Sequence, residues 1–220
     1  MKTILFQGDS ITDAHRSKEN NANAGIGYVT LVKGELGLEY PNRYNIYNKG
    51  IKGNRVVDLY ARSKEDIINL KPDILSILIG VNDVWHEINY QHGVEAEKYF
   101  KVYSMLIEEI REALPDVKII IMEPFVLKGL KTEDTEECPD KWNLFSTEVK
   151  KRAAKAKEIA EKYDLPFIPL QDKFDEAAKL APNHYWLEDG VHPTTAGHEL
   201  IKREWINAFK NIYRTNENNQ

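Results

Sequence analysis

Five short apolar runs along the chain have the length and composition of buried β-strands. Each is rich in Ile, Val, Leu or aromatic residues and is too short for a helix. They occupy residues 3–6, 44–47, 74–79, 117–122 and 166–170. The sequence therefore predicts five strands.

Longer stretches between these runs carry apolar residues three and four positions apart, which is the spacing of one face of an α-helix. They lie at 28–36, 59–67, 99–110, 142–163, 172–180 and 195–213. Strands that alternate with helices pair in parallel through right-handed crossovers, and the helices cover both faces of the sheet. The expected fold class is α/β, a three-layer α/β/α sandwich around a five-stranded parallel sheet.

A length of 220 residues favours a single domain. We expect this domain to span residues 1–214, followed by a frayed polar tail at 215–220. With 42% apolar and 30% charged residues, the chain can bury a sizeable core. Residues 128–141 form a polar insertion, either a mobile flap or a surface loop, and the surface loop is favoured.

Charge and cysteine content narrow the class of protein. The net charge is -5, from 30 basic and 35 acidic residues, which disfavours nucleic acid as a partner. Cys138 is the only cysteine, so neither an internal disulfide nor a cysteine-based metal site is expected. No secretory signal or run of about 18 apolar residues is visible, so we expect a cytoplasmic protein without a membrane partner.

Ligands of such folds bind beyond the carboxyl ends of the strands, and the loop after the first strand holds a candidate nucleophile there. Its sequence is Gly-Asp-Ser-Ile-Thr-Asp at residues 8–13, with Ser10 at the sheet edge. A serine nucleophile needs a histidine base, an orienting carboxylate and donors for the oxyanion. A serine at this position can equally be the N-cap of a helix.

The loops after the second and third strands offer candidate oxyanion donors. Gly50, in the Asn-Lys-Gly-Ile-Lys-Gly-Asn turn, could donate its backbone N–H, or the turn could simply need glycine for a positive φ. Asn82, in Gly-Val-Asn-Asp, could donate from its carboxamide, or it could cap a helix.

A carboxylate lies three residues before a histidine near the carboxyl end of the chain. Asp189 could hold the Nδ1–H of His192 and leave Nε2 free to accept a serine proton. A purely structural Asp–His pair is the alternative. A metal site built from His184, His192 and His198 would have no recognised ligand spacing.

Four blocks together resemble the SGNH (GDSL) hydrolase superfamily in order and spacing. They are residues 8–12, the turn that contains Gly50, Gly-Val-Asn-Asp at 80–83 and Asp-Gly-Val-His-Pro at 189–193. The resemblance implies a flavodoxin-like fold, a catalytic triad of Ser10, Asp189 and His192, and no metal or cofactor. It also implies an oxyanion hole formed by Ser10, Gly50 and Asn82.

The segments around Asn82 and His192 are similar to intracellular acetylxylan esterases and related carbohydrate acetylesterases. This similarity implies a small acylated substrate, such as an acetylated xylo-oligosaccharide. Asp9, Trp85 and Trp186 are then candidate substrate-binding residues, although both indoles could instead pack the loops. Related acetylxylan esterases form large homo-oligomers, which leaves that assembly open for this chain.

Three other functions remain to be separated from this hypothesis. A lysophospholipase or thioesterase of the same superfamily would keep the triad and prefer longer acyl chains. A non-catalytic sugar-binding module would keep the fold without turnover, and intact Ser10, Asp189 and His192 argue against it. A metal-dependent hydrolase would be sensitive to chelators.

Overall fold

The computed structural model describes the backbone of residues 1–217 and the side chains of residues 1–212. Five strands form one parallel sheet in the order β2-β1-β3-β4-β5, which confirms the expected α/β class. This is the doubly wound order of flavodoxin-like folds. The strands are β1 (Lys2–Gly8), β2 (Tyr44–Asn48), β3 (Ile74–Leu78), β4 (Lys118–Met122) and β5 (Phe167–Ile168).

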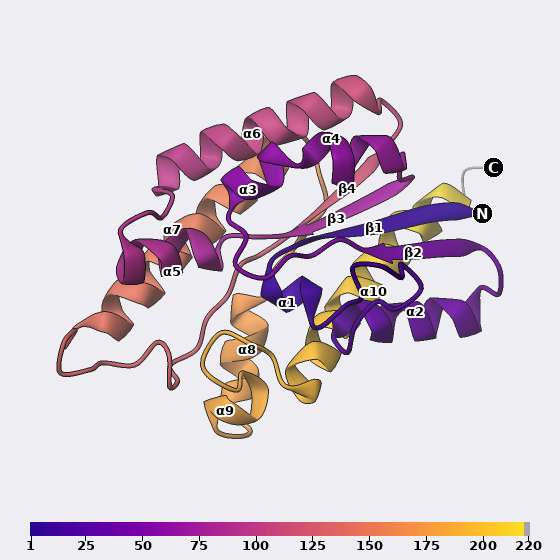
Figure 1. The fold of residues 1–220 in the computed structure, drawn as a ribbon. Helices are drawn as coiled ribbons and strands as arrows, with labels where there is room; N and C mark the ends of the chain where they lie inside the picture. The colour runs from indigo at the N-terminus through magenta and orange to yellow at the C-terminus, as the bar shows by residue number, and fades with distance from the viewer. Residues whose placement is uncertain (218–220) are drawn as a thin grey trace.

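Helices cover both faces of the sheet (Figure 1). One face carries α3 (Val56–Ala61), α4 (Ser63–Asp66), α6 (Ala96–Ala113) and the C-terminal half of α7 (Lys141–Lys162). The other carries α2 (Tyr28–Glu39), α8 (Gln171–Ala178) and α10 (Thr195–Glu217). Successive side chains of a strand point to opposite faces. On β3, Leu75 and Ile77 accordingly pack in the core beneath α3, α6 and α7. Ile74 and Leu78 pack in the core beneath α2, α8 and α10.

Several helices differ from the expected set. The stretch around 59–67 is not one helix, because it is divided into α3, α4 and the 3-10 turn η1 (Ile68–Leu70). Three further helices are α1 (Ser10–Asp13), α5 (Val81–Tyr90) and α9 (Asn183–Trp186). Both α1 and α5 begin within two or three residues of a strand end, so they leave little room for the turns expected there.

The last helix extends to Glu217, four residues past its expected end at 213 and into the expected polar tail. Positions 218–220 of that tail lie outside the described residues. No helix within residues 1–217 is long and apolar enough to cross a membrane.

A buried tryptophan fixes α10 on the centre of the sheet. The Trp205 side chain is fully buried, and its Nε1–H donates to Ser76 Oγ on β3 at 3.0 Å. Its ring lies 5.0 Å from the ring of Phe6 on β1, measured between centroids. Because α10 begins at Thr195, this anchor also determines where the segment preceding the helix lies over the sheet.

We predict that Trp205→Ala lowers the free energy of unfolding by about 3–5 kcal/mol, because it leaves a cavity and removes the hydrogen bond that the buried Ser76 hydroxyl accepts. Guanidinium denaturation of both proteins measures the difference. Leu180→Ala is the control, since Leu180 is 84% exposed and its loss should change stability by no more than about 0.5 kcal/mol. A loss below about 1 kcal/mol for Trp205→Ala would show that this anchor is dispensable.

Candidate active site

Ser10 lies at the carboxyl edge of the sheet, directly after β1 and at the start of α1. The strand order reverses between β1 and β3, which is where doubly wound folds bind ligands. The preceding Asp9 caps α1 by accepting the Ile11 N–H at 2.9 Å. The N-cap is therefore Asp9, and the half-buried Ser10 keeps its hydroxyl available for other partners.

Three of the residues singled out in the sequence form one linked set. Ser10 Oγ lies 2.9 Å from His192 Nε2, and His192 Nδ1 lies 2.7 Å from Asp189 Oδ2. The other carboxylate oxygen, Oδ1, accepts the backbone N–H groups of Val191 and His192 at 3.0 and 2.9 Å. Gly190, at φ +96°, supplies the positive φ that this tight turn requires. A proton can thus move from the serine to a histidine whose ring is oriented by a carboxylate.

These hydrogen bonds also determine the charge of Asp189. Burial of the carboxyl group opposes ionisation, but the hydrogen bonds from the ring and backbone of His192 outweigh it and hold the pKa of Asp189 well below its usual range. Asp189 is therefore ionised wherever the protein is folded near neutral pH. It can balance a positive charge that forms on His192.

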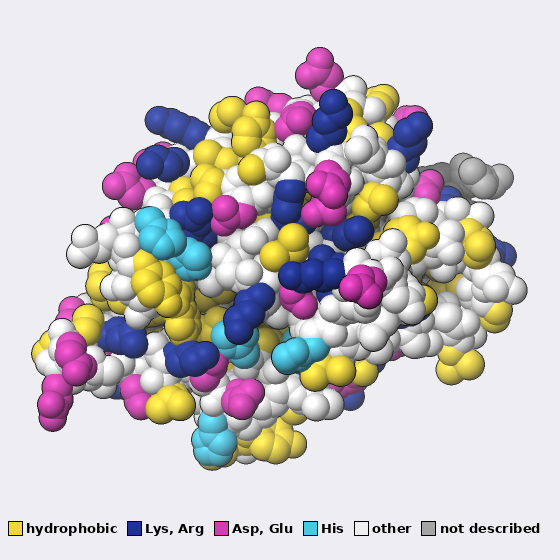
Figure 2. Space-filling model, in the orientation of Figure 1, with side chains coloured by type: hydrophobic (Ala, Val, Ile, Leu, Met, Phe, Trp, Pro, Cys, Tyr) yellow, Lys and Arg dark blue, Asp and Glu magenta, His cyan; other side chains and the backbone are white. Residues whose placement is uncertain are grey.

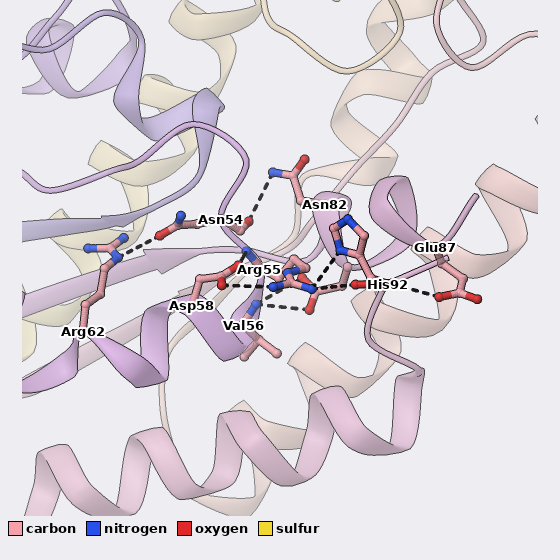
Figure 3. Close-up of polar contacts among 10 residues, drawn as sticks. Asn54, Arg55, Val56, Asp58, Arg62, Asn82, Glu87 and His92 are labelled. Atoms are coloured by element: carbon pink, nitrogen blue, oxygen red, sulfur yellow. Dashed lines mark hydrogen bonds and ion pairs between the residues drawn. The ribbon is translucent and has the colours of Figure 1, made fainter. Parts of the chain in front are cut away.

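Asn82 is held against the loop that follows β2. Its Nδ2 donates one hydrogen to the Asn54 carbonyl at 3.2 Å, which leaves the second hydrogen of the amide for another acceptor (Figure 3). Arg62 supports the same loop by donating to Asn54 Oδ1 at 2.8 Å. The buried Asp83 accepts the Val56 N–H at 3.1 Å, and burial raises its pKa well above the usual range.

Gly50 does not fit the donor role predicted for it. Its N–H donates to Asn48 Oδ1 at 2.9 Å, and its carbonyl accepts the Arg16 Nε–H at 2.7 Å. A Cβ at Gly50 would lie 2.3 Å from the Asp13 backbone nitrogen, so the residue must be glycine for close packing against α1. Both polar groups of its backbone are thus engaged within the protein.

The second glycine of the same turn, Gly53, differs from Gly50 in its backbone N–H. Gly53 has a φ of +82° and directly precedes Asn54, whose carbonyl binds the Asn82 amide. Within the residues that the structure describes, the Gly53 N–H has no hydrogen-bond partner. The same holds for the N–H of Ser10, which is the first residue of its helix.

A cavity of about 920 Å³ opens beside Ser10 and His192. Its lining includes Ile26, Leu130, Lys131, Asp189 and His198. On this face of the molecule, Lys, Arg and His side chains gather around a hollow (Figure 2).

The three candidate substrate-binding residues do not line this cavity. Asp9 is buried as the cap of α1, and burial raises its pKa to about 7. Trp85 packs edge-to-face on Phe145, and Trp186 packs in the same way on Tyr185, with both indoles partly buried against the core. The loop-packing interpretation therefore describes both tryptophans better than sugar stacking.

His198, which the sequence offers only as a possible metal ligand, lines the cavity. Its Nδ1 accepts the Tyr28 N–H at 3.2 Å, so the neutral ring must carry its proton on Nε2. Burial lowers the pKa of His198 to about 4, and the charge of His192 acts in the same direction. The only signal in the sequence is its position six residues after His192. Among the described residues, no three His, Cys, Asp or Glu side chains are arranged to hold a metal ion.

We predict that Asp9→Asn stabilises the protein relative to wild type increasingly as pH rises from about 4 to 7. The pKa of Asp9 is raised to about 7 in the folded state, so the unfolded chain ionises first and the wild type loses stability across this window. The gap should widen by on the order of 3 kcal/mol. Denaturant unfolding at several pH values measures it, with Asp116→Asn at an exposed turn as the charge control. A constant gap would contradict the burial of an ionisable Asp9.

Comparison with known proteins identifies the family. Residues 6–200 match the model of the GDSL-like lipase/acylhydrolase family. An acetylxylan esterase of Geobacillus stearothermophilus is 35% identical over 210 residues, which cover 92% of this chain and 91% of that enzyme. Its crystal structure superposes with a TM-score of 0.79 at 33% identity, covering 94% of this chain and 93% of that one. Two of its solved variants, described as catalytic mutants, replace a serine and an aspartate by alanine.

A crystal structure from Parabacteroides merdae, described as a GDSL-like lipase, superposes with a TM-score of 0.86 at 36% identity and covers 94% of both chains. The match to the family model runs from β1 into α10, so it includes every loop that contributes to the site described above. The chain therefore belongs to the GDSL-like lipase/acylhydrolase family and is a carboxylic ester hydrolase.

Proposed function

We propose that this protein is a serine esterase that removes acetyl groups from carbohydrate esters such as acetylated xylo-oligosaccharides. The observation that carries the proposal is the continuous link from Ser10 Oγ through the His192 ring to Asp189 Oδ2, with distances of 2.9 and 2.7 Å. The similar acetylxylan esterase supports the substrate class. Its catalytic mutants at a serine and an aspartate support the same residue types here.

In the first half of the reaction, His192 Nε2 takes the Ser10 hydroxyl proton while Ser10 Oγ bonds to the ester carbonyl carbon. The carbonyl oxygen becomes an oxyanion. The free N–H groups of Ser10 and Gly53 and the second amide hydrogen of Asn82 are the donors that would stabilise it. Gly53 thus takes the place that the sequence assigns to Gly50.

Breakdown of this intermediate cleaves the bond between the carbonyl carbon and the sugar oxygen. His192 returns its proton to the leaving alcohol, and the acetyl group stays on Ser10. A water molecule then attacks the acetyl-enzyme, with His192 again accepting and returning a proton, to release acetate. Asp189, ionised and bound to the ring, stabilises the positive charge on His192 in both halves.

The predictions about location, partners and cofactors rest on the sequence alone. The cytoplasmic location and the absence of nucleic-acid and membrane partners stay predictions, as does a mechanism without metal or cofactor. The sequence leaves the homo-oligomeric state open.

Acetate release from acetylated xylo-oligosaccharides, measured beside hydrolysis of p-nitrophenyl octanoate, tests the proposal. We expect wild type to release acetate readily and to turn over octanoate poorly, and Ser10→Ala to lose nearly all of both activities. Preference for octanoate would move the enzyme to the lysophospholipase or thioesterase branch. Undiminished acetate release by Ser10→Ala would rule out the proposed nucleophile.

The oxyanion assignment generates a separate prediction. Asn82→Ala should lower kcat for acetate release by about a hundred- to a thousandfold, because one side-chain donor is lost where charge develops in the transition state. Asn89→Ala, at an exposed position on the same helix, is the matched control and should keep wild-type kcat. Equal kcat values for Asn82→Ala and its control would remove Asn82 from the oxyanion hole.

A further inference from the structure

The polar insertion at residues 128–141 lies against the turn that contains Asp189. The Leu127 N–H donates to the Gly190 carbonyl, and the Lys131 N–H donates to the Asp189 carbonyl, both at 2.9 Å. Gly129 approaches the same turn so closely that a Cβ there would lie 2.6 Å from the Gly190 nitrogen. The segment is thus hydrogen-bonded to the candidate active site, which neither a free flap nor a simple surface loop would be.

A buried threonine stabilises this arrangement from within the segment. The Thr132 side chain is fully buried, its hydroxyl donates to the Leu127 carbonyl at 2.8 Å, and it accepts the Gly129 N–H at 2.9 Å. The backbone from Leu127 to Thr132 is therefore closed into a compact turn. This turn determines where the intervening Lys131 side chain can reach.

Lys131 extends from this turn to the candidate triad. Its Nζ lies 3.0 Å from Asp189 Oδ2, which is the same oxygen that binds His192 Nδ1. It also lies 5.5 Å from the centre of the Trp85 ring, a cation–π distance that helps to hold the ammonium group in place. The carboxylate of Asp189 is thus shared between the His192 ring and the Lys131 ammonium group.

We propose that Lys131 is a positioning residue that keeps His192 available as a neutral base at more acidic pH. The proposal rests on the triad role of Asp189 and His192 in the proposed function. An ionised aspartate favours a proton on the adjacent imidazole, and a lysine on the same carboxylate offsets part of that attraction. Lys131 therefore makes protonation of His192 in the free enzyme less favourable, which preserves activity as pH falls.

Other charged groups around His192 come from several elements. Buried Asp9 lies before α1, and when ionised it favours protonation of His192. Because burial raises the pKa of Asp9 to about 7, this carboxyl carries little charge on the acid side of that pH. His198, on α10, stays neutral above about pH 4. The remaining titratable groups that line the cavity are Asp13, His15, Lys18, Lys52 and Glu188. All of these are retained in a Lys131 variant, so a comparison with wild type isolates the effect of Lys131.

Solvent limits the size of the effect. The Lys131 side chain is 47% exposed and that of Asp189 is 11% exposed, so water screens the pair from one side. We expect loss of the charge to move the acid limb of the pH profile of kcat/KM upward by about 0.5 pH unit. Salt should weaken the same interaction.

The test compares pH profiles of kcat/KM for p-nitrophenyl acetate at low salt. Lys131→Met should shift the midpoint of the acid limb upward by about 0.5 unit and keep the plateau within about threefold of wild type. Lys131→Arg, which retains the charge, should restore the wild-type midpoint. Lys128→Met is the matched control, because Lys128 is 46% exposed, lies in the same segment and pairs with Asp134 instead. It should leave the midpoint unchanged.

A second arm uses salt and an observable that does not depend on turnover. In 1 M NaCl the wild-type midpoint should rise toward that of Lys131→Met, which itself should move less. NMR titration of the His192 ring protons should show the same upward shift in Lys131→Met.

Acid limbs that coincide for wild type and Lys131→Met would overturn the proposal, as would Lys131→Arg behaving like Lys131→Met. Ser10→Ala separates this result from a failure of the proposed function. Retained activity in Ser10→Ala would refute the triad itself. An inactive Ser10→Ala beside an unshifted Lys131→Met would refute only the role of Lys131.

Discussion

Both oxygens of the Asp189 carboxylate are engaged, and the geometry of the site depends on how that carboxylate is held. Oδ1 binds two backbone N–H groups of its own turn, which orients Oδ2 toward the His192 ring. Because the ring is held through Nδ1, its Nε2 points to Ser10. One buried carboxylate therefore connects a turn near the C-terminus to a serine near the N-terminus.

The opposite side of the site depends on polar contacts between loops rather than on a single residue. The loop after β2 is held by Asn82 at the Asn54 carbonyl, by Asp83 at the Val56 N–H and by Arg62 at the Asn54 side chain. These groups are buried or partly buried, and each pairs the loop or the start of α3 with a residue of α5 or with Arg62 between α3 and α4. Such a network limits relative movement of the loops, as preorganised oxyanion donors require.

Much of the site could be predicted because parallel strands bring their carboxyl ends to one edge of the sheet. Ser10 follows β1 and Asn82 follows β3, and these two strands are neighbours. Gly50 shows where this reasoning ends. The turn after β2 holds two glycines, and only the packing of α1 and the side chain of Asn48 show that the Gly50 N–H is occupied while that of Gly53 is free. Trp85 and Trp186 were expected near the substrate because of their neighbours in sequence, yet their rings pack on other aromatic residues.

The sequence by itself determined the fold class and the five strands, and it singled out the residues proposed as the triad. Apolar periodicity and motif spacing are local properties, so they can be read without coordinates. Tertiary structure alone decided which backbone N–H groups stay free, that His198 carries its proton on Nε2, and that Lys131 reaches Asp189 across 58 positions of sequence. These features depend on contacts between segments whose separation along the chain carries no information about their distance in space.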